Sequence, residues 1–272
     1  MDRTPGKKLH SSEREELILS LLAVRGFITF QDLEAGVSAS PATIRRDLEK
    51  LERMQRITRV RGGARLVRPD EPNVGAQLSG IPFNENLSRD LAAKLAIGRE
   101  AAKLCRRGDS IIIDGGSTTL QMCPHLEGLS LQILTNSLHI VSALLPQART
   151  SIMLPAGTLF REQNILLSPY QDDGVNRFRA SRMFMGAAAV GSHGVMQSDV
   201  ILVHAERRLI GLADQLILLV DSSKFEDHTG HLVCGLEDIS VLITDDRIGD
   251  AAASIIEARI GQLIVAPVSP AT

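Results

Sequence analysis

The chain has 272 residues, 44% of them hydrophobic and 23% charged, with a formal net charge of −2, as in soluble globular proteins of one large domain or two ordinary ones. Its three cysteines are far apart and odd in number, which argues against a disulfide framework and a zinc knuckle. No apolar run approaches the ~18–20 residues that span a bilayer, and the N-terminus lacks the apolar core of a secretory signal, so a cytoplasmic protein without membrane contact is expected.

The charge is divided unevenly along the chain. Residues 1–68 hold 14 Lys and Arg against 9 Asp and Glu, a net of +5, whereas the remainder carries a net of −7. Such asymmetry favours a protein whose basic N-terminal part binds a polyanion while the acidic remainder does not. A small domain that is basic by chance would give the same balance, so the motifs have to decide.

The first helix is expected to begin near a capping box, Ser12-Glu13-Arg14-Glu15, and to end at Gly26. Leucine and isoleucine recur at helical spacing between these two signals. Residues 27–29 then read as a short β-like stretch, and residues 30–36 as a second short helix. Together they predict the start of a small helical domain.

The segment "VSASPATIRRDLEKLERM" predicts a third helix with an N-cap at Ser40 and a proline at its first position. Ile44, Leu48 and Leu51 form its buried stripe, which leaves small and basic residues on the exposed faces. In a helix-turn-helix the start of the last helix enters the major groove. The predicted DNA-contacting residues here are Ser40, Ala42, Thr43, Arg45, Arg46 and Lys50.

A two-strand hairpin around Gly62-Gly63 follows, with Arg59, Arg61 and Arg65 on or beside it. A basic hairpin after a helix-turn-helix is typical of a wing, and Arg59 and Arg61 are predicted DNA contacts. Residues 41–68 hold nine basic residues against three acidic ones, which weakens the alternative of a small helical domain with a solvated charged face. We expect double-stranded DNA as a partner of residues 1–67.

Residues 68–84 are rich in Pro, Gly and polar residues and predict a linker. From residue 85 to residue 272, near-continuous apolar strands alternate with helical stretches, among them residues 91–108, 118–126, 137–145 and 202–213. This alternation is typical of a mostly parallel sheet covered on both faces. The fold class is therefore α/β, behind an N-terminal winged helix-turn-helix.

Ligands of parallel sheets bind beyond the carboxyl ends of the strands, so "DGGSTT", "TNS" and "DSSK" are expected along one crevice. Glycines allow the loop to approach a ligand, and hydroxyls, a helix N-terminus and Lys224 suit a phosphate or carboxylate. The alternative is that the glycines serve only a tight strand-to-helix turn. No phosphate-binding loop of the Gly-x4-Gly-Lys-Ser/Thr type and no Gly-x-Ser-x-Gly elbow occurs. His228 and His231 fit a solvated loop better than a metal site, and for Arg161 and Glu162 both pocket and surface remain open.

Nearly the whole chain resembles the DeoR-type family of bacterial transcriptional repressors. "SPATIRRDLEKLE" with "RVRGGA" is similar to the family's DNA-binding signature, and "RGDSIIIDGGSTT", "ILTNSL" and "LVDSSKF" are similar to its sensor motifs. The resemblance implies a sugar-phosphate sensor domain related in fold to ribose-phosphate isomerases and CoA transferases. "LLSPY" after "REQN" is similar to the subgroup of the ascorbate-utilisation repressor, which points to an acidic or polyol sugar phosphate.

One departure from the family stands out. The family often has Glu-Ala-x-Val-Lys-Arg where this chain has "LVHAER", so Glu206 occupies the lysine position and Arg207 the arginine. A charge reversal beside the pocket puts the usual effector in doubt. The predicted effector-binding residues, by resemblance and by position, are Lys94, Asp114, Gly115, Gly116, Ser117, Thr118, Thr119, Thr135, Asn136, Ser137, Glu206, Arg207, Asp221 and Lys224.

The sequence thus predicts a regulator, most simply a repressor of a carbohydrate or polyol catabolic operon, whose operator binding responds to a phosphorylated sugar or sugar acid. A homodimer or homotetramer is expected because one winged domain grips little DNA, and no metal, cofactor or catalytic residue is expected. A sugar-phosphate isomerase-like enzyme on the same fold, with Asp114 or Glu206 as general base, is one alternative. A sensor that acts by protein contact through a degenerate winged domain is another.

Overall fold

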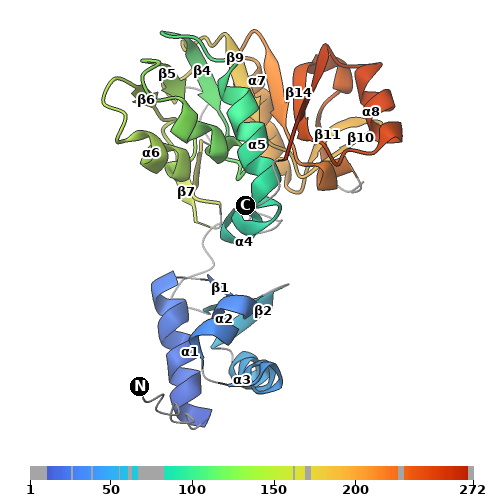
Figure 1. Cartoon of the computed structure of the whole chain (residues 1–272). Helices are drawn as coiled ribbons and strands as arrows, with labels where there is room; N and C mark the ends of the chain where they lie inside the picture. Colours follow the sequence, from blue (N-terminus) through green and yellow to red (C-terminus); the bar gives the residue numbers. More distant parts are fainter. Residues whose placement is uncertain are drawn as a thin grey trace, which may run out of the picture. The chain divides into compact units, whose positions relative to one another are not determined.

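The computed structural model divides the chain into two compact units, Met1–Ala76 and Gln77–Thr272, each of which is described by itself (Figure 1). The structure describes residues 11–25, 27–37, 39–54, 56–60, 63–66, 83–161, 163–168, 173–225 and 230–268. Most of the predicted linker 68–84 lies outside these ranges, and only its last two residues are seen, at the start of a helix. The exact domain boundary stays a prediction.

The N-terminal unit is a winged helix-turn-helix, as predicted. Its elements are α1 (Ser11–Arg25), β1 (Phe27–Thr29), α2 (Phe30–Gly36), α3 (Pro41–Arg53), β2 (Ile57–Val60) and β3 (Gly63–Leu66). The three strands pair antiparallel in the order β1-β3-β2. Apolar side chains from all three helices meet the sheet in one core, of which Ile18, Leu33, Ile44, Leu51 and Ile57 are all buried.

The caps of α2 and α3 come from the residues that precede them. The Ser40 hydroxyl accepts from the Thr43 amide at 3.3 Å, with Pro41 at the first helical position, as expected. The predicted capping box at Ser12 is wrong in detail, because the helix already includes Ser11. The Glu15 carboxylate accepts instead from the Ser11 hydroxyl at 2.8 Å and from Lys50 Nζ at 2.7 Å. Gly26, the predicted end of this helix, is not among the described residues.

The C-terminal unit is a three-layer α/β domain (Figure 1). A seven-stranded sheet runs in the order β15-β14-β12-β9-β4-β5-β6, and every pair in it is parallel. Its strands are β4 (Ser110–Ile113), β5 (Gln132–Leu134), β6 (Ser151–Met153), β9 (Arg182–Met185), β12 (Leu216–Leu219), β14 (Ile239–Asp245) and β15 (Gln262–Ala266).

Helices cover both faces of this sheet. The helical elements are α4 (Phe83–Ser88), α5 (Leu91–Ala102), the 3₁₀ helix η1 (Thr119–His125), α6 (Leu138–Leu144), α7 (Val200–Ile210), η2 (Ser222–Phe225), η3 (Leu236–Asp238) and α8 (Asp250–Glu257). Ile111 and Ile113 of β4 enter the core beneath α5, η1 and α6, whereas Ile112 enters the core beneath α7 and α8. Side chains alternate across a strand, so a run of isoleucines fits a strand that is buried on both faces.

Two small sheets flank the main one. Strands β10 (Ala189–Gly191), β11 (Gly194–Gln197) and β13 (His231–Cys234) pair antiparallel, and β7 (Thr158–Phe160) pairs with β8 (Ile165–Leu167). In the main sheet β4 is followed by β5 and β6 on one side and flanked by β9 on the other. The chain therefore changes direction between β4 and β9, which is where the crevice of an open α/β sheet is expected.

Two predicted helices differ in form. Within the predicted helix 118–126, Thr119–His125 form a 3₁₀ helix of seven residues with Pro124 inside it, rather than an α-helix. The helix predicted over residues 91–108 ends at Ala102, six residues before Gly108. Among the described residues, no helix is long and apolar enough to cross a membrane.

Candidate functional site

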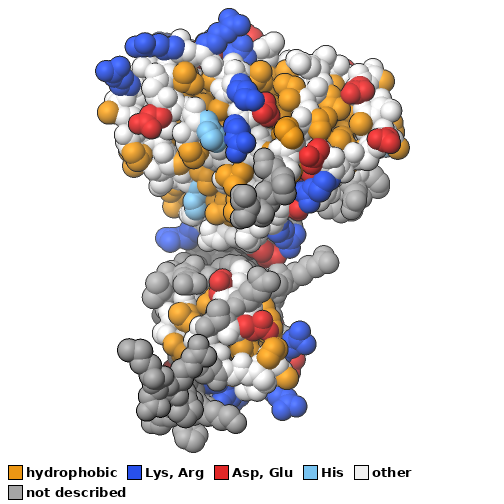
Figure 2. Space-filling view, in the orientation of Figure 1, with side chains coloured by type: hydrophobic (Ala, Val, Ile, Leu, Met, Phe, Trp, Pro, Cys, Tyr) orange, Lys and Arg blue, Asp and Glu red, His pale blue; other side chains and the backbone are white. Residues whose placement is uncertain are grey.

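Helix α3 presents a small, basic face at its N-terminal end. Ile44, Leu48 and Leu51 point into the core, as predicted. Ser40, Ala42, Arg45 and Arg46 are exposed, and Thr43 is half-buried with its hydroxyl 2.8 Å from that of Ser40. Figure 2 shows Lys and Arg side chains at the surface of this unit. The arrangement suits a recognition helix, because small residues let the backbone approach DNA and arginine reads guanine edges.

Ion pairs fasten α3 to α1. Arg14 meets the buried Asp47 in a bidentate pair, with Nε–Oδ2 at 2.7 Å and a second contact to Oδ1 at 3.1 Å. Lys50, a predicted DNA contact, has its ammonium 2.7 Å from Glu15 of α1 and is half-buried. Its charge is thus partly neutralised inside the unit. The Arg45 guanidinium lies 5.2 Å from the Phe30 ring centroid, which steadies that side chain.

The wing arginines are only partly visible. Arg59 lies in β2, but nothing is described of its side chain, and Arg61 lies outside the described residues. Their roles in DNA contact remain predictions.

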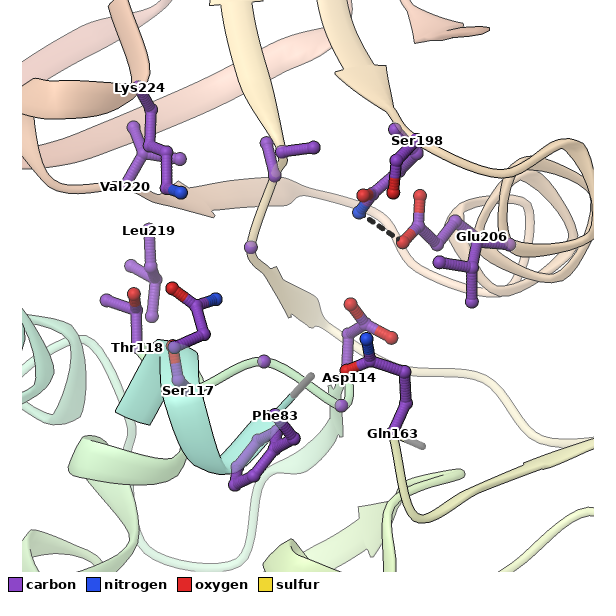
Figure 3. A pocket seen from close by; sticks show the side chains of 18 of the residues that line it. Phe83, Asp114, Ser117, Thr118, Gln163, Ser198, Glu206, Leu219, Val220 and Lys224 are labelled. Atoms are coloured by element: carbon purple, nitrogen blue, oxygen red, sulfur yellow. Dashed lines mark hydrogen bonds between the residues drawn. The ribbon is translucent and has the colours of Figure 1, made fainter. Parts of the chain in front are cut away.

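The C-terminal unit has a pocket of about 250 Å³ at the carboxyl ends of β4, β9 and β12, in the expected crevice (Figure 3). This is slightly below the roughly 300–1,000 Å³ of pockets for drug-sized ligands, and it suits a small metabolite. The lining residues are Phe83, Asn86, Asp114, Gly115, Gly116, Ser117, Thr118, Gln163, Ile165, Gly186, Ala187, Ala188, Gln197, Ser198, Leu202, Glu206, Leu219, Val220 and Lys224.

The loop after β4 is built for close packing. A Cβ on Gly115 would lie 2.6 Å from Cγ2 of Ile165, so a larger residue would require a shift. The Thr119 hydroxyl accepts from the Gly116 amide at 3.0 Å and donates to the Asp114 carbonyl at 2.7 Å. Thr119 therefore holds the loop from behind, while Ser117 and Thr118 line the pocket. Since the following helix is a short 3₁₀ helix, these hydroxyls and Lys224 carry the case for an anion more than a helix dipole does.

One wall of the pocket is acidic. Burial raises the pKa of Asp114 to about 6. The pKa of Glu206 is raised well above its ordinary value, first by burial and then by the negative charge of Asp114. Gln197 donates its side-chain amide to Glu206 Oε1 at 2.6 Å, which is the dashed line in Figure 3. Glu206 Oε2 has no hydrogen-bond partner within the described part of the chain.

The opposite wall is basic. Lys224 lines the pocket on the same side as Thr118 and Ser117 (Figure 3). Lys94 of α5 is buried just behind, where its ammonium donates to the carbonyl oxygen of Asn86. Burial lowers the pKa of Lys94 to about 8, although the charge of Asp221 opposes the shift. Lys94 thus supports the basic wall without lining the cavity.

Besides Lys94 and Thr119, five predicted effector residues lie outside this pocket. Arg207 turns away from it, donating to the carbonyls of Val233 at 2.7 Å and Leu232 at 3.0 Å. Asp221 accepts from the Ser223 amide at 3.2 Å. Thr135 and Ser137 are buried and organise the start of α6. The Ser137 amide donates to Thr135 Oγ1 at 3.1 Å, and the Ile140 amide donates to Ser137 Oγ at 3.4 Å.

Asn136 faces a second cavity, of about 460 Å³, between β8 and α7. Its Oδ1 atom has no partner among the residues the structure describes. The "TNS" loop therefore borders the predicted crevice from behind and does not line its floor.

Sequence reasoning missed several lining residues, including Phe83, Asn86, Gln163, Gln197 and Ser198. These come from α4, from the loop before β8 and from the end of β11. Gly186 to Ala188 had a signal, because they follow the apolar strand "MFM" where a ligand loop is expected. In the described ranges no three His, Cys, Asp or Glu side chains gather as a metal site.

Comparisons with known proteins match both units. A family model described as the DeoR C-terminal sensor domain matches residues 89–246, and one described as a DeoR-like helix-turn-helix domain matches residues 14–70. The HTH-type transcriptional regulators UlaR of Shigella dysenteriae serotype 1 and of Escherichia coli K12 / DH10B are each 28% identical to the chain over 248 residues, which is 91% of this chain and 96% of the relative.

Solved structures are similar at a lower level. Ribose 5-phosphate isomerase A from Methanocaldococcus jannaschii aligns with 52% of this chain and 55% of its own at 18% identity, with a TM-score of 0.36. The eIF2B delta subunit from Chaetomium thermophilum aligns with 79% of this chain and 68% of its own at 14% identity, with a TM-score of 0.39. Similarity of this size carries no argument about function.

Proposed function

Because the chain belongs to the DeoR family of transcriptional regulators, we propose that it represses a carbohydrate or polyol catabolic operon and that a phosphorylated sugar or sugar acid modulates its operator binding. The alternative of a sugar-phosphate isomerase-like enzyme is not supported, since the relatives that match over nearly their whole length are named HTH-type transcriptional regulators and not enzymes. What remains for proposal is the operon, the effector and the direction of its effect.

The observation that carries the proposal is the face of α3. Its first turns expose Ala42, Arg45 and Arg46 while the opposite face is buried in the core. On DNA these residues would read base edges, and further arginines of the unit would pair with phosphates. A homodimer or homotetramer would bring two such helices onto paired half-sites.

The sensor half rests on the pocket. A phosphate fits the wall formed by Ser117, Thr118 and Lys224, since hydroxyls and an ammonium are its usual partners. If an effector changes the operator affinity by some factor, operator DNA must change the effector affinity by the same factor. This reciprocity makes the proposal measurable from either side.

The test uses DNA from upstream of the protein's own gene and its neighbours, with binding followed by fluorescence anisotropy. Sugar, polyol and sugar-acid phosphates are added in turn, and at least one is expected to change the DNA affinity. The Arg45→Ala/Arg46→Ala variant is expected to bind at least about tenfold more weakly, at roughly 1–3 kcal/mol per base contact. A matched control, Arg106→Ala/Arg107→Ala, removes two exposed arginines of the other unit. Equal binding by both variants would refute the DNA-binding assignment, and indifference to every compound would refute the sensor assignment.

A further inference from the structure

The pocket has an acidic wall that a phosphate does not explain. Asp114 at the end of β4 and Glu206 of α7 are 6% and 3% exposed, and both line the cavity. In Figure 3 their carboxyl groups lie on the side of the pocket away from Lys224, Thr118 and Ser117. The cavity is thus polarised, with a basic end and an acidic end.

The acidic wall has no cation of its own within the described structure. Lys224 is the single basic residue among the lining residues, and it stands at the other end. Arg207, the next residue along α7, is turned to the carbonyls of β13. The groups that face Glu206 are Asp114, the amide of Gln197 and, from β13, the thiol of Cys234. None of these is a cation.

Such an arrangement is unfavourable in the empty pocket. Burial disfavours the charged form of both carboxyl groups and raises the pKa of each, and the charge of Asp114 raises the pKa of Glu206 further. One carboxyl oxygen of Glu206 is buried without a hydrogen-bond partner in the described residues, and the residue itself lines the cavity. A group of this kind is stabilised when a ligand brings a donor or a positive charge to it.

A purely structural role explains the pair less well. A residue that only packs α7 against β11 would need no acid, and an apolar or amide side chain of similar size would avoid the desolvation of a carboxyl group. The Gln197 amide satisfies one Glu206 oxygen at 2.6 Å and leaves the other buried without a hydrogen-bond partner among the described residues.

We infer that the effector carries a protonated amine at the end remote from its phosphate, and that Asp114 and Glu206 bind this ammonium while Ser117, Thr118 and Lys224 bind the phosphate. The effector class is an amino-sugar phosphate or aminated polyol phosphate. This inference rests on the proposed function and narrows it. A sugar acid, which would place a carboxylate against the same wall, is disfavoured.

The binding step has a proton balance. Without a cation in the pocket Glu206 keeps its proton, because burial and the charge of Asp114 both raise its pKa. An arriving ammonium pairs with both carboxylates, and the proton of Glu206 leaves to solvent. A neutral hydroxyl at the same position brings no charge, so it leaves that proton in place.

The test is calorimetric titration of the full-length protein with inorganic phosphate and with matched pairs of hexose 6-phosphates. Each pair consists of the parent and its 2-amino-2-deoxy analogue, in the gluco, galacto and manno series. An ammonium hydrogen-bonded to carboxylates is expected to bind about tenfold to a hundredfold more tightly than the hydroxyl in at least one series. Buffers of different ionisation enthalpy are expected to reveal proton release with the amine alone. The aldonic acid 6-phosphates are expected to bind more weakly than the parents.

The variant Glu206→Gln keeps the shape of the side chain and removes its acid. It is expected to reduce the preference for the amine by about tenfold and to leave the affinity for inorganic phosphate unchanged. The matched control is Glu127→Gln, which makes the same substitution at an exposed position. Glu127 lies near the amino end of β4, since the nearby Leu129 carbonyl accepts from the amide of Gly108, which precedes that strand.

The outcomes separate the two claims. If the parents bind and shift operator affinity but no amine analogue binds more tightly, or if Glu206→Gln keeps the full preference, the inference is wrong and the proposed function stands. If no sugar phosphate binds, or none changes operator binding, the proposed function fails and the inference fails with it.

Discussion

Gly98 sits where helix α5 touches the segment that carries the pocket loop. A Cβ built on Gly98 would lie 2.5 Å from the backbone carbonyl carbon of Gln121 in η1 and 2.7 Å from its oxygen. Carbon atoms normally pack at about 3.5–4.0 Å, so Gly98→Ala requires the two helices to separate by roughly 1 Å. The contact is backbone on the η1 side, so no side chain can turn out of the way.

Two effects oppose each other in this variant. Alanine in a helix interior is favoured over glycine by about 1 kcal/mol. Overpacking a buried contact costs typically 1–3 kcal/mol, and a clash with backbone falls at the upper end. The clash wins, and the expected net loss is about 1–2 kcal/mol. For a unit of this size each kcal/mol lowers the Tm by roughly 2–4 °C, so a fall of about 2–8 °C is expected.

Thermal unfolding of the full chain followed by circular dichroism measures the effect. The control is Gly211→Ala at the end of α7, where φ is −65° and the nearest atoms to an added Cβ lie at 3.5 Å and 3.8 Å. That substitution is expected to raise stability by about 0.4–1 kcal/mol through the unfolded chain alone. If Gly98→Ala raised the Tm as Gly211→Ala does, the close approach of α5 and η1 would be refuted.

Three further predictions concern charges. Asp47→Ala removes the carboxylate that pairs with Arg14 of α1, whose side chain is only 14% exposed. The variant is expected to destabilise the winged unit by about 3 kcal/mol, because it leaves a largely buried arginine without its partner. Amide exchange in α1 and α3 is expected to become roughly hundredfold faster, and unchanged exchange would contradict the prediction. Lys50→Met is expected to reduce the salt dependence of operator binding less than Arg46→Met does, because the Lys50 ammonium is already paired with Glu15. Anisotropy titrations at several salt concentrations measure the salt dependence of each variant. The raised pKa of Asp114 means that its protonated form stabilises the fold; that contribution is present below its ordinary pKa of 3.8 and is lost as pH rises through about 6. Asp114→Asn is therefore expected to gain on wild type by about 3 kcal/mol between pH ~4 and ~7 in denaturant titrations, and parallel pH curves would contradict the burial argument.

Much of the fold could be predicted from local patterns. The stripe of Ile44, Leu48 and Leu51 fixed which face of α3 is buried, because helical periodicity alone decides it. Three isoleucines before Asp114 predicted a strand covered on both faces, which is how β4 sits. The form of residues 118–126 could not be predicted in this way, since the packing of α5 against them at Gly98 is a tertiary contact.

The sites divide along the same line. The pocket loop was found because glycines and hydroxyls follow a strand, and that signal is contiguous in sequence. The turn of Arg207 away from the pocket could not be predicted, because neighbouring residues on a helix point in different directions and only the placement of α7 against β13 decides which one faces the cavity. Gln163, Gln197 and Ser198 carry no motif and reach the pocket through the fold of the small sheets.

The sequence by itself determined that a basic winged helix precedes a parallel α/β domain with a loop of glycines and hydroxyl residues after its first strand, since these features depend on local periodicity, caps and turn residues. Only the tertiary structure decided that Glu206 and Asp114 share a wall of one cavity opposite Lys224. They lie far apart along the chain. Their burial, the effect of the Asp114 charge on Glu206 and the unpartnered buried oxygen of Glu206 exist only once β4 and α7 meet at the same edge of the sheet.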